Sequence, residues 1–267
     1  MKHTLYSADG AKAEIALNGA HVTSWIPQEF GEQLFLSQQS DLKAGASIRG
    51  GVPVIFPQFA ALGNLPKHGF ARNQLWHLRQ SDQPDRAVFE LRDNDMTRAI
   101  WPHAFLAEIT VVISGLALEV ELAVTNTGTT PFDFTAALHT YLRVDDIAAT
   151  RLLGLQGTTY RDSVTGTNGC VEKDDECAIV GQVDRIYFNA SNKLTVKRNH
   201  HSVLVQSIGF PDAVVWNPGP ELSAAMADME PQGYQRMLCV EAANIGNPVV
   251  LQSGQRWSAA QRLLVSK

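Results

Sequence analysis

Two side chains suited to proton transfer lie in apolar stretches of this chain. His139 is in AALHTYL at residues 136–142, and Glu241 is in MLCVEAAN at residues 237–244. An imidazole and a carboxylate can exchange protons with a substrate near neutral pH when a fold brings them together. Each also has a purely structural explanation, because a histidine in an apolar strand is commonly buried and hydrogen-bonded, and a glutamate at a strand end is commonly exposed at the sheet rim.

A second group of candidate residues is cationic and lies in SIRGGVPVIFPQFAALGNLPKHGFARNQLW, residues 47–76. Arg49 precedes a pair of glycines, and Lys67, His68 and Arg72 follow within six positions of one another. The glycines and prolines exclude a helix interior and allow the backbone to approach a ligand closely. This pattern is typical either of a loop-built pocket for an anion or of a Gly/Pro-rich edge with solvated cations.

Composition places the chain among soluble globular proteins. It has 267 residues, of which 45% are hydrophobic and 18% charged. Its net charge of −5 argues against a general affinity for nucleic acid or an anionic membrane. An anionic substrate would therefore have to be bound by a local group of cations.

The cysteines and the first residues of the sequence indicate in which cellular compartment the protein is expected. Cys170, Cys177 and Cys239 are odd in number, and their spacing resembles neither a disulfide framework nor a zinc site. The first residues, MKHTLYSADGAKAEI, lack the apolar segment of a signal peptide, and no apolar run is long enough to span a bilayer. We expect a cytoplasmic protein that acts without a membrane or nucleic acid.

The elements that must position these side chains are short strands. Apolar and polar residues alternate at 117–124, and Asn18-Gly19 is a typical hairpin turn. One helix is predicted, at residues 221–229. The predicted strand regions are 11–26, 76–79, 87–92, 105–114, 116–125, 132–144, 194–199, 202–208, 214–216, 237–241 and 255–265, with turn clusters at 81–85 and 165–169. Many short strands with almost no helix predict one all-β domain over residues 1–267, an antiparallel β-sandwich or barrel.

Several of these stretches together resemble a known family. RGGVPVIFPQF followed by LPKHGFARNQLW is similar to the signature of the hexose-6-phosphate 1-epimerases, a branch of the aldose 1-epimerase (galactose mutarotase-like) superfamily. ALHTYLRV at 137–144, VDRIYFN at 183–189, DAVVWNP at 212–218 and MLCVEAANI at 237–245 continue the match in the same order. Any one motif is weak, but the ordered set covers nearly the whole chain and is specific.

The resemblance implies a fold and a set of roles. The fold would be a large β-sandwich of two twisted antiparallel sheets with a few short helices, and the site would lie on a concave sheet face. Glu241 would be the catalytic base and His139 the acid. Asp184 would hold sugar hydroxyls, and Arg49 and Arg72 would bind the substrate, with its phosphate as the expected group.

Four further residues have more than one interpretation. Lys67 stands where this family usually has Gln, and Leu222 stands where many relatives have Lys, so both affect the expected specificity. His68 is expected in the pocket wall, where it could contact a ligand. Trp216 could offer an aromatic face to a sugar or fill the core.

The function that joins these residues is interconversion of the α and β anomers of glucose 6-phosphate or a similar sugar phosphate. Such a mutarotase needs no redox cofactor and no metal ion, and we expect a monomer. Two alternatives remain open: an aldose 1-epimerase for unphosphorylated sugars, and a non-catalytic carbohydrate-binding protein or sensor on the same fold.

Overall fold

The computed structural model of this protein describes residues 1–43, 45–79 and 83–267, which fold mainly as antiparallel strands in three sheets. The smallest sheet has the order β1-β2-β3. Its strands are β1 (Lys2–Tyr6), β2 (Lys12–Ala16) and β3 (His21–Ile26). Asn18-Gly19 lies in the turn between β2 and β3, so the predicted hairpin is confirmed.

The eight-stranded sheet has the order β13-β12-β15-β18-β19-β9-β4, with β10 also paired to β19. β9 and β10 follow one another along the same edge of β19 and are separated by His139-Thr140. The strands are β4 (Val54–Ile55), β9 (Phe132–Leu138), β10 (Tyr141–Arg143), β12 (Thr159–Asp162), β13 (Thr167–Val171), β15 (Val183–Tyr187), β18 (Asp212–Asn217) and β19 (Met237–Leu251).

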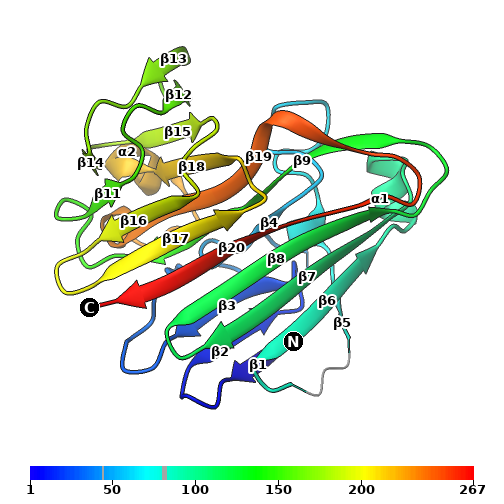
Figure 1. Ribbon diagram of the computed structural model, residues 1–267, viewed down its shortest axis with the longest axis horizontal. Coiled ribbons are helices and arrows are strands. Elements are labelled where there is room, and N and C mark those ends of the chain that lie inside the picture. Colours follow the sequence, from blue (N-terminus) through cyan, green and yellow to red (C-terminus); the bar gives the residue numbers. More distant parts are fainter. Residues whose placement is uncertain (44, 80–82) are drawn as a thin grey trace.

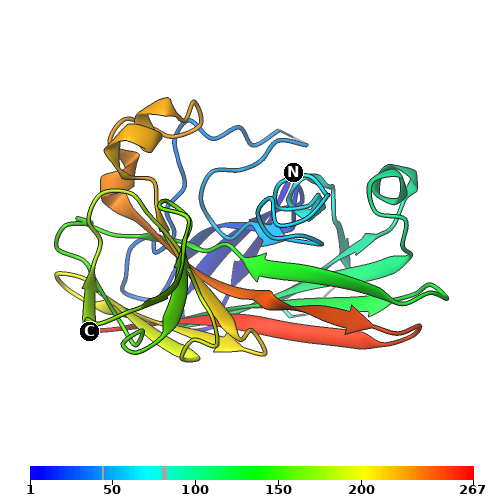
Figure 2. The same cartoon turned by 90° about the horizontal axis from the view of Figure 1, so that it is seen from above.

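The nine-stranded sheet has the order β14-β11-β16-β17-β20-β8-β7-β6-β5 (Figure 1). Its strands are β5 (His77–Arg79), β6 (Arg86–Arg92), β7 (Phe105–Ser114), β8 (Ala117–Asn126), β11 (Arg151–Leu153), β14 (Glu176–Ala178), β16 (Lys193–Lys197), β17 (Ser202–Ile208) and β20 (Arg256–Ser266). Figure 2 shows β9 and β19 as a layer over β20, with α2 (Gly219–Ala225) on the opposite side of that layer from β20. The predicted all-β sandwich is confirmed.

The main core lies between the layers and follows the predicted alternation. In β8, Leu118, Val120, Leu122 and Val124 are buried, whereas Glu119, Glu121 and Thr125 on the other face are partly exposed. In β19 the alternation separates two environments: Leu238, Val240 and Ala242 join the main core, and the residues between them face outward from the sandwich. That outer face of β19 carries the candidate site.

Differences from the predicted elements have local causes. Helix α2 starts at Gly219 and ends at Ala225, because Met226 adopts an extended conformation, so the predicted end at residue 229 is wrong. Met229 instead packs with Phe35 and other outer-face residues, a tertiary contact that overrides helix propensity. The region 145–181 contains the short strands β11 to β14, which turn-rich sequence concealed.

A short helix, α1 (Asp95–Ile100), was not predicted, although Asn94 and Thr97 form a capping box at its start. Within the turn cluster at 81–85, Ser81 and Asp82 lie outside the described residues. In the described part of the chain, no helix has the length and apolar character needed to cross a membrane.

Candidate active site

Glu241 and His139 meet at the centre of the eight-stranded sheet. Leu138 at the end of β9 pairs with Ala242 of β19, and this register places the next residue, His139, beside Glu241. The distance from His139 Nε2 to Glu241 Oε1 is 3.3 Å. Glu241 was expected at a strand end, but it lies within the 15-residue strand β19 and is 1% exposed. The explanation of an exposed carboxylate at the sheet rim is therefore wrong.

The electrostatics of this pair follow from its burial. Burial, with a further contribution from the charge of Asp184, raises the pKa of the Glu241 carboxyl well above its ordinary value. Burial also lowers the pKa of His139 well below its ordinary value, and the neighbouring His68, Arg49 and Arg72 act in the same direction. Burial thus disfavours the charged form of both groups, and such perturbed pKa values are typical of titratable residues at functional sites.

Each member of the pair keeps an atom free for a further hydrogen bond. His139 Nδ1 and Glu241 Oε2 are buried and have no hydrogen-bond partner among the described residues. Tyr141 fixes the imidazole plane, because its ring stacks on that of His139 at 4.9 Å with an angle of 13°. Trp216 meets the same imidazole edge-on at 6.1 Å.

A cavity of about 580 Å³ adjoins the pair. Its size is typical of small-molecule sites. The cavity brings together most of the residues singled out in the sequence, from at least five separate segments. The predicted residues that line it are Arg49, Lys67, His68, His139, Asp184, Trp216, Leu222 and Glu241.

Arg49 is engaged in interactions within the protein. Its Nε donates to Asp228 Oδ2 at 3.1 Å, its Nη2 lies 3.0 Å from the same oxygen, and its Nη1 donates to the Tyr141 hydroxyl at 2.9 Å. The guanidinium carbon lies 6.0 Å from the centre of the Trp216 ring. Arg49 therefore braces the cavity wall next to Tyr141 and Trp216, and Asp228 offsets much of its charge.

His68 and Arg72 occupy different positions relative to the cavity. The amide of Ala60 donates to His68 Nδ1 at 3.3 Å, and burial lowers the pKa of His68 to about 3. His68 is therefore neutral with its proton on Nε2, and its ring lies 5.6 Å from that of His139. Arg72 does not line the cavity, and its Nη2 donates to the backbone oxygen of Lys67 at 3.3 Å.

The glycines of residues 47–76 are needed for close backbone packing. Gly69 has φ +66°, and a Cβ there would lie 2.1 Å from Phe56 O. Gly51 has φ +61°, and a Cβ there would lie 2.2 Å from Val22 O. Only glycine combines this backbone conformation with such an approach. The glycines thus fix the loops that carry Arg49, Lys67 and His68.

The family follows from comparison with known proteins. The sequence profile of the family described as aldose 1-epimerase matches residues 1–264. This chain belongs to the aldose 1-epimerase family.

Individual relatives of this epimerase-family chain are similar over almost its full length. A protein of Cenchrus ciliaris, named as a candidate glucose-6-phosphate 1-epimerase, is 37% identical over 96% of this chain and 82% of its own. A protein of Escherichia coli with the same name is 36% identical over 96% of this chain and 87% of its own. The crystal structure of the candidate mutarotase YeaD from Salmonella typhimurium superposes with a TM-score of 0.88 at 34% identity, covering 96% of this chain and 88% of the other.

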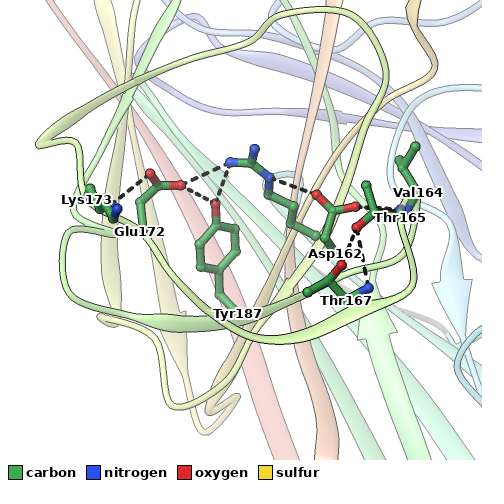
Figure 3. Close-up of polar contacts among 8 residues, drawn as sticks. Asp162, Val164, Thr165, Thr167, Glu172, Lys173 and Tyr187 are labelled. Carbon is green, nitrogen blue, oxygen red and sulfur yellow. Dashed lines mark hydrogen bonds and ion pairs between the residues drawn. The ribbon is translucent and has the colours of Figure 1, made fainter.

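Asp184 and its neighbour Arg185 lie on opposite faces of β15 in this epimerase-family fold. Asp184 lines the cavity, and burial raises the pKa of its carboxyl. Arg185 belongs to the network on the other face, where its Nη1 and the Tyr187 hydroxyl both contact Glu172 Oε2, at 3.1 and 2.8 Å (Figure 3). Arg185 is thus paired with Glu172 and not with its sequence neighbour Asp184.

Sequence reasoning missed two polar residues of the cavity, Arg161 and Ser163. Both belong to β12 and the turn after it, and this strand was not predicted. The alternation of Tyr160, Arg161 and Asp162 before a turn is a signal that could have indicated a short strand. It would not have shown which face of the strand meets the cavity.

Proposed function

We propose that this protein is a hexose-6-phosphate mutarotase, an isomerase that interconverts the α and β anomers of glucose 6-phosphate or a similar sugar phosphate. The observation that carries the proposal is the buried pair of Glu241 and His139, 3.3 Å apart beside a cavity lined by cations. The names of the relatives from Cenchrus ciliaris and Escherichia coli support the same reaction and substrate.

The proposed reaction moves protons and one carbon–oxygen bond. Glu241, as the base, takes the proton of the C1 hydroxyl, and His139, as the acid, gives a proton to the ring oxygen. The bond from C1 to the ring oxygen breaks with its electrons on that oxygen, and C1 becomes an aldehyde. Rotation about the C1–C2 bond, followed by closure with the two roles reversed, yields the other anomer.

The other cavity residues have proposed roles in holding the pyranose. Asp184 accepts hydrogen bonds from sugar hydroxyls, and Trp216 supplies an aromatic face at the end of β18. The Nε2–H of His68 donates to a substrate oxygen beside His139. Leu222 adds an apolar contact from α2.

The wild-type protein should accelerate exchange between the anomers of glucose 6-phosphate more strongly than those of glucose. The reason is that phosphate contacts fix the ring against the acid and the base, and so raise turnover as well as affinity. Magnetisation-transfer NMR on both sugars, with and without protein, measures this directly. Equal acceleration would favour an aldose 1-epimerase for unphosphorylated sugars, and tight sugar binding without any acceleration would favour a non-catalytic sensor.

Phosphate binding by Arg49 and Arg72 stays a prediction, and the structure makes either arginine less available for it than the sequence indicated. Arg49 lines the cavity but is paired with Asp228, and Arg72 lies outside the lining. If they bind phosphate, Arg49→Ala and Arg72→Ala should each lower kcat/KM for glucose 6-phosphate by about one to two powers of ten and affect glucose far less. Equal losses on both sugars would show that the two arginines support the cavity wall or the ring instead.

A further inference from the structure

The cations that line the cavity differ in whether a carboxylate of the protein already pairs with them. Arg49 is bound by Asp228 and Tyr141. Arg161 and Lys67 also line the cavity, and within the described ranges no carboxylate lies at ion-pair distance from either one. Arg161 Nε is buried without a hydrogen-bond partner among those residues. Arg161 and Lys67 are therefore the cavity cations with unused binding capacity.

The register of β12 and β15 fixes the direction of Arg161. Arg161 pairs with Ile186, which lines the cavity, and the amide of Ser163 donates to the backbone oxygen of Asp184 at 2.7 Å. Because side chains alternate along a strand, Arg161 shares the cavity face with Asp184 and Ile186. Asp162 is thereby directed to the opposite face, where it pairs with Arg185.

The network on that opposite face keeps nearby acids away from Arg161. The Arg185 guanidinium contacts both Asp162 and Glu172: its Nε lies 3.7 Å from Asp162 Oδ2, and its Nη1 donates to Glu172 Oε2 at 3.1 Å. The same guanidinium lies 4.8 Å from the centre of the Tyr160 ring. Asp162 Oδ1 also accepts hydrogen bonds from the backbone amides of Val164 and Thr165, both at 3.0 Å. These contacts hold β12 in place while leaving the charge of Arg161 available to a ligand.

Asp184 lines the same cavity and interacts electrostatically with both this cation pair and Glu241. Lys67 and Arg161 both oppose the effect of burial on the pKa of Asp184, so both lie near its carboxylate. Asp184 in turn acts on the pKa of Glu241. A pyranose held by Asp184 can thus present its reacting carbon to Glu241 and an anionic substituent to the two cations.

We propose that Arg161 and Lys67 form the subsite for the phosphate group of the substrate, and that Arg161 determines the preference for phosphorylated sugars. The inference rests on the proposed function and names the residues that give it specificity. The ligand class is a phosphate monoester dianion. An arginine fork can bind two of its oxygens together, and the lysine adds a point charge.

The test compares Arg161→Gln, Lys67→Gln and the double variant with wild type. Each single change should raise KM for glucose 6-phosphate by about tenfold to a hundredfold and leave exchange of glucose within about twofold, because glucose has no phosphate to lose. Lys173→Gln is the matched control, since it removes one charge from an exposed residue that follows β13 and does not line the cavity. Arg161→Lys should recover part of the loss, and thermal unfolding reports whether each variant is folded.

A second measurement separates this inference from the proposed function. Binding of inorganic phosphate, measured by calorimetry, should weaken about tenfold or more in Arg161→Gln and remain unchanged in Lys173→Gln. If wild type accelerates neither sugar, the proposed function fails, and the phosphate measurement still decides the subsite. Unaltered phosphate binding in Arg161→Gln and Lys67→Gln, or equal losses on both sugars, would overturn the inference.

Discussion

At the residue scale, the central feature is a carboxyl and an imidazole that the fold removes from water together. Among the described residues, the ion pairs include no partner for Glu241 or His139 other than each other, at 3.3 Å. Burying a carboxylate is costly unless it is paired and fully hydrogen-bonded. A protein retains such an arrangement most readily where the perturbed groups have a chemical role.

Loss of either group should remove most of the catalysis. Glu241→Gln and His139→Ala should each lower kcat for glucose 6-phosphate by about a hundredfold or more, the usual scale for positioned proton transfer. Magnetisation-transfer NMR gives the rate, and circular dichroism checks the fold. A folded Glu241→Gln protein with wild-type turnover would exclude this carboxylate as the base.

Glu241→Gln should lower turnover but raise the stability of the folded protein. The pKa of Glu241 is raised in the folded state, so its contribution to stability is fully present below the ordinary value of 4.5 and is lost as pH rises through the folded pKa. Glutamine does not titrate. Glu241→Gln should therefore gain unfolding free energy relative to wild type between pH 5 and pH 8, measured by urea denaturation. A constant difference between the two proteins across this range would contradict the burial argument.

At the element scale, the site depends on segments that are short and closely packed. Residues 47–76 approach β3 through Gly51 and pair with β9 through the short strand β4. β12 is held by contacts made on the face away from the cavity. These segments have few residues in regular strands. Their position is therefore set by specific backbone contacts more than by long hydrogen-bonded ladders.

Gly69 should be far less replaceable than a glycine of similar φ in open space. Gly69→Ala places a Cβ against Phe56 O and should lower the free energy of unfolding by about 3 kcal/mol or more. Gly157 has φ +77° with no atom near its Cβ position, so Gly157→Ala should cost only about 1–2 kcal/mol. Urea denaturation of both variants measures the difference, and similar costs would show that the loop can shift.

At the scale of the whole molecule, the fold buries two histidines outside the proposed acid–base pair, His21 and His68, and keeps them neutral. Burial lowers the pKa of His21 to about 4 and that of His68 to about 3. His21 lies under the glycine pair after Arg49, where its Nε2 is 2.7 Å from Gly50 O. Protonation of any of them therefore opposes the folded state.

Stability should consequently fall on mild acidification. A histidine with a lowered folded pKa contributes stability that is fully present above its ordinary pKa of 6.5 and is lost as pH falls toward the folded value. Urea denaturation should show that the contribution of these histidines to the unfolding free energy decreases between pH 6.5 and about pH 4, opposite in sign to that of Glu241. His68→Asn, in which asparagine tolerates the positive φ of this position, should flatten that decrease.

The exposed His200 offers the control for this measurement. His200→Asn changes a histidine in the turn between β16 and β17 and should leave the pH dependence of the wild type intact. An unchanged slope in His68→Asn would show that His68 does not resist protonation in the folded protein.

The sequence by itself determined the fold class and most of the residues that form the candidate site. Alternation over 117–124 predicted a half-buried strand because side chains of a strand point to opposite faces, and Asn18-Gly19 predicted a hairpin through its turn geometry. His139 and Glu241 stood out because polar groups within apolar strands require a partner or a function. The ordered motifs then placed the chain in the aldose 1-epimerase family.

Tertiary structure alone decided which of these residues meet and which cations remain available. The register between β9 and β19 places His139 beside Glu241, and no local pattern encodes a pairing between segments so distant in sequence. Likewise, α2 ends at Ala225, so Asp228 lies outside the helix, where it forms an ion pair with Arg49. Arg161 belongs to the site only because β12 pairs with β15 and turns Asp162 away. Strand register and facing are properties of the assembled sheet, since they depend on contacts between residues far apart in the chain.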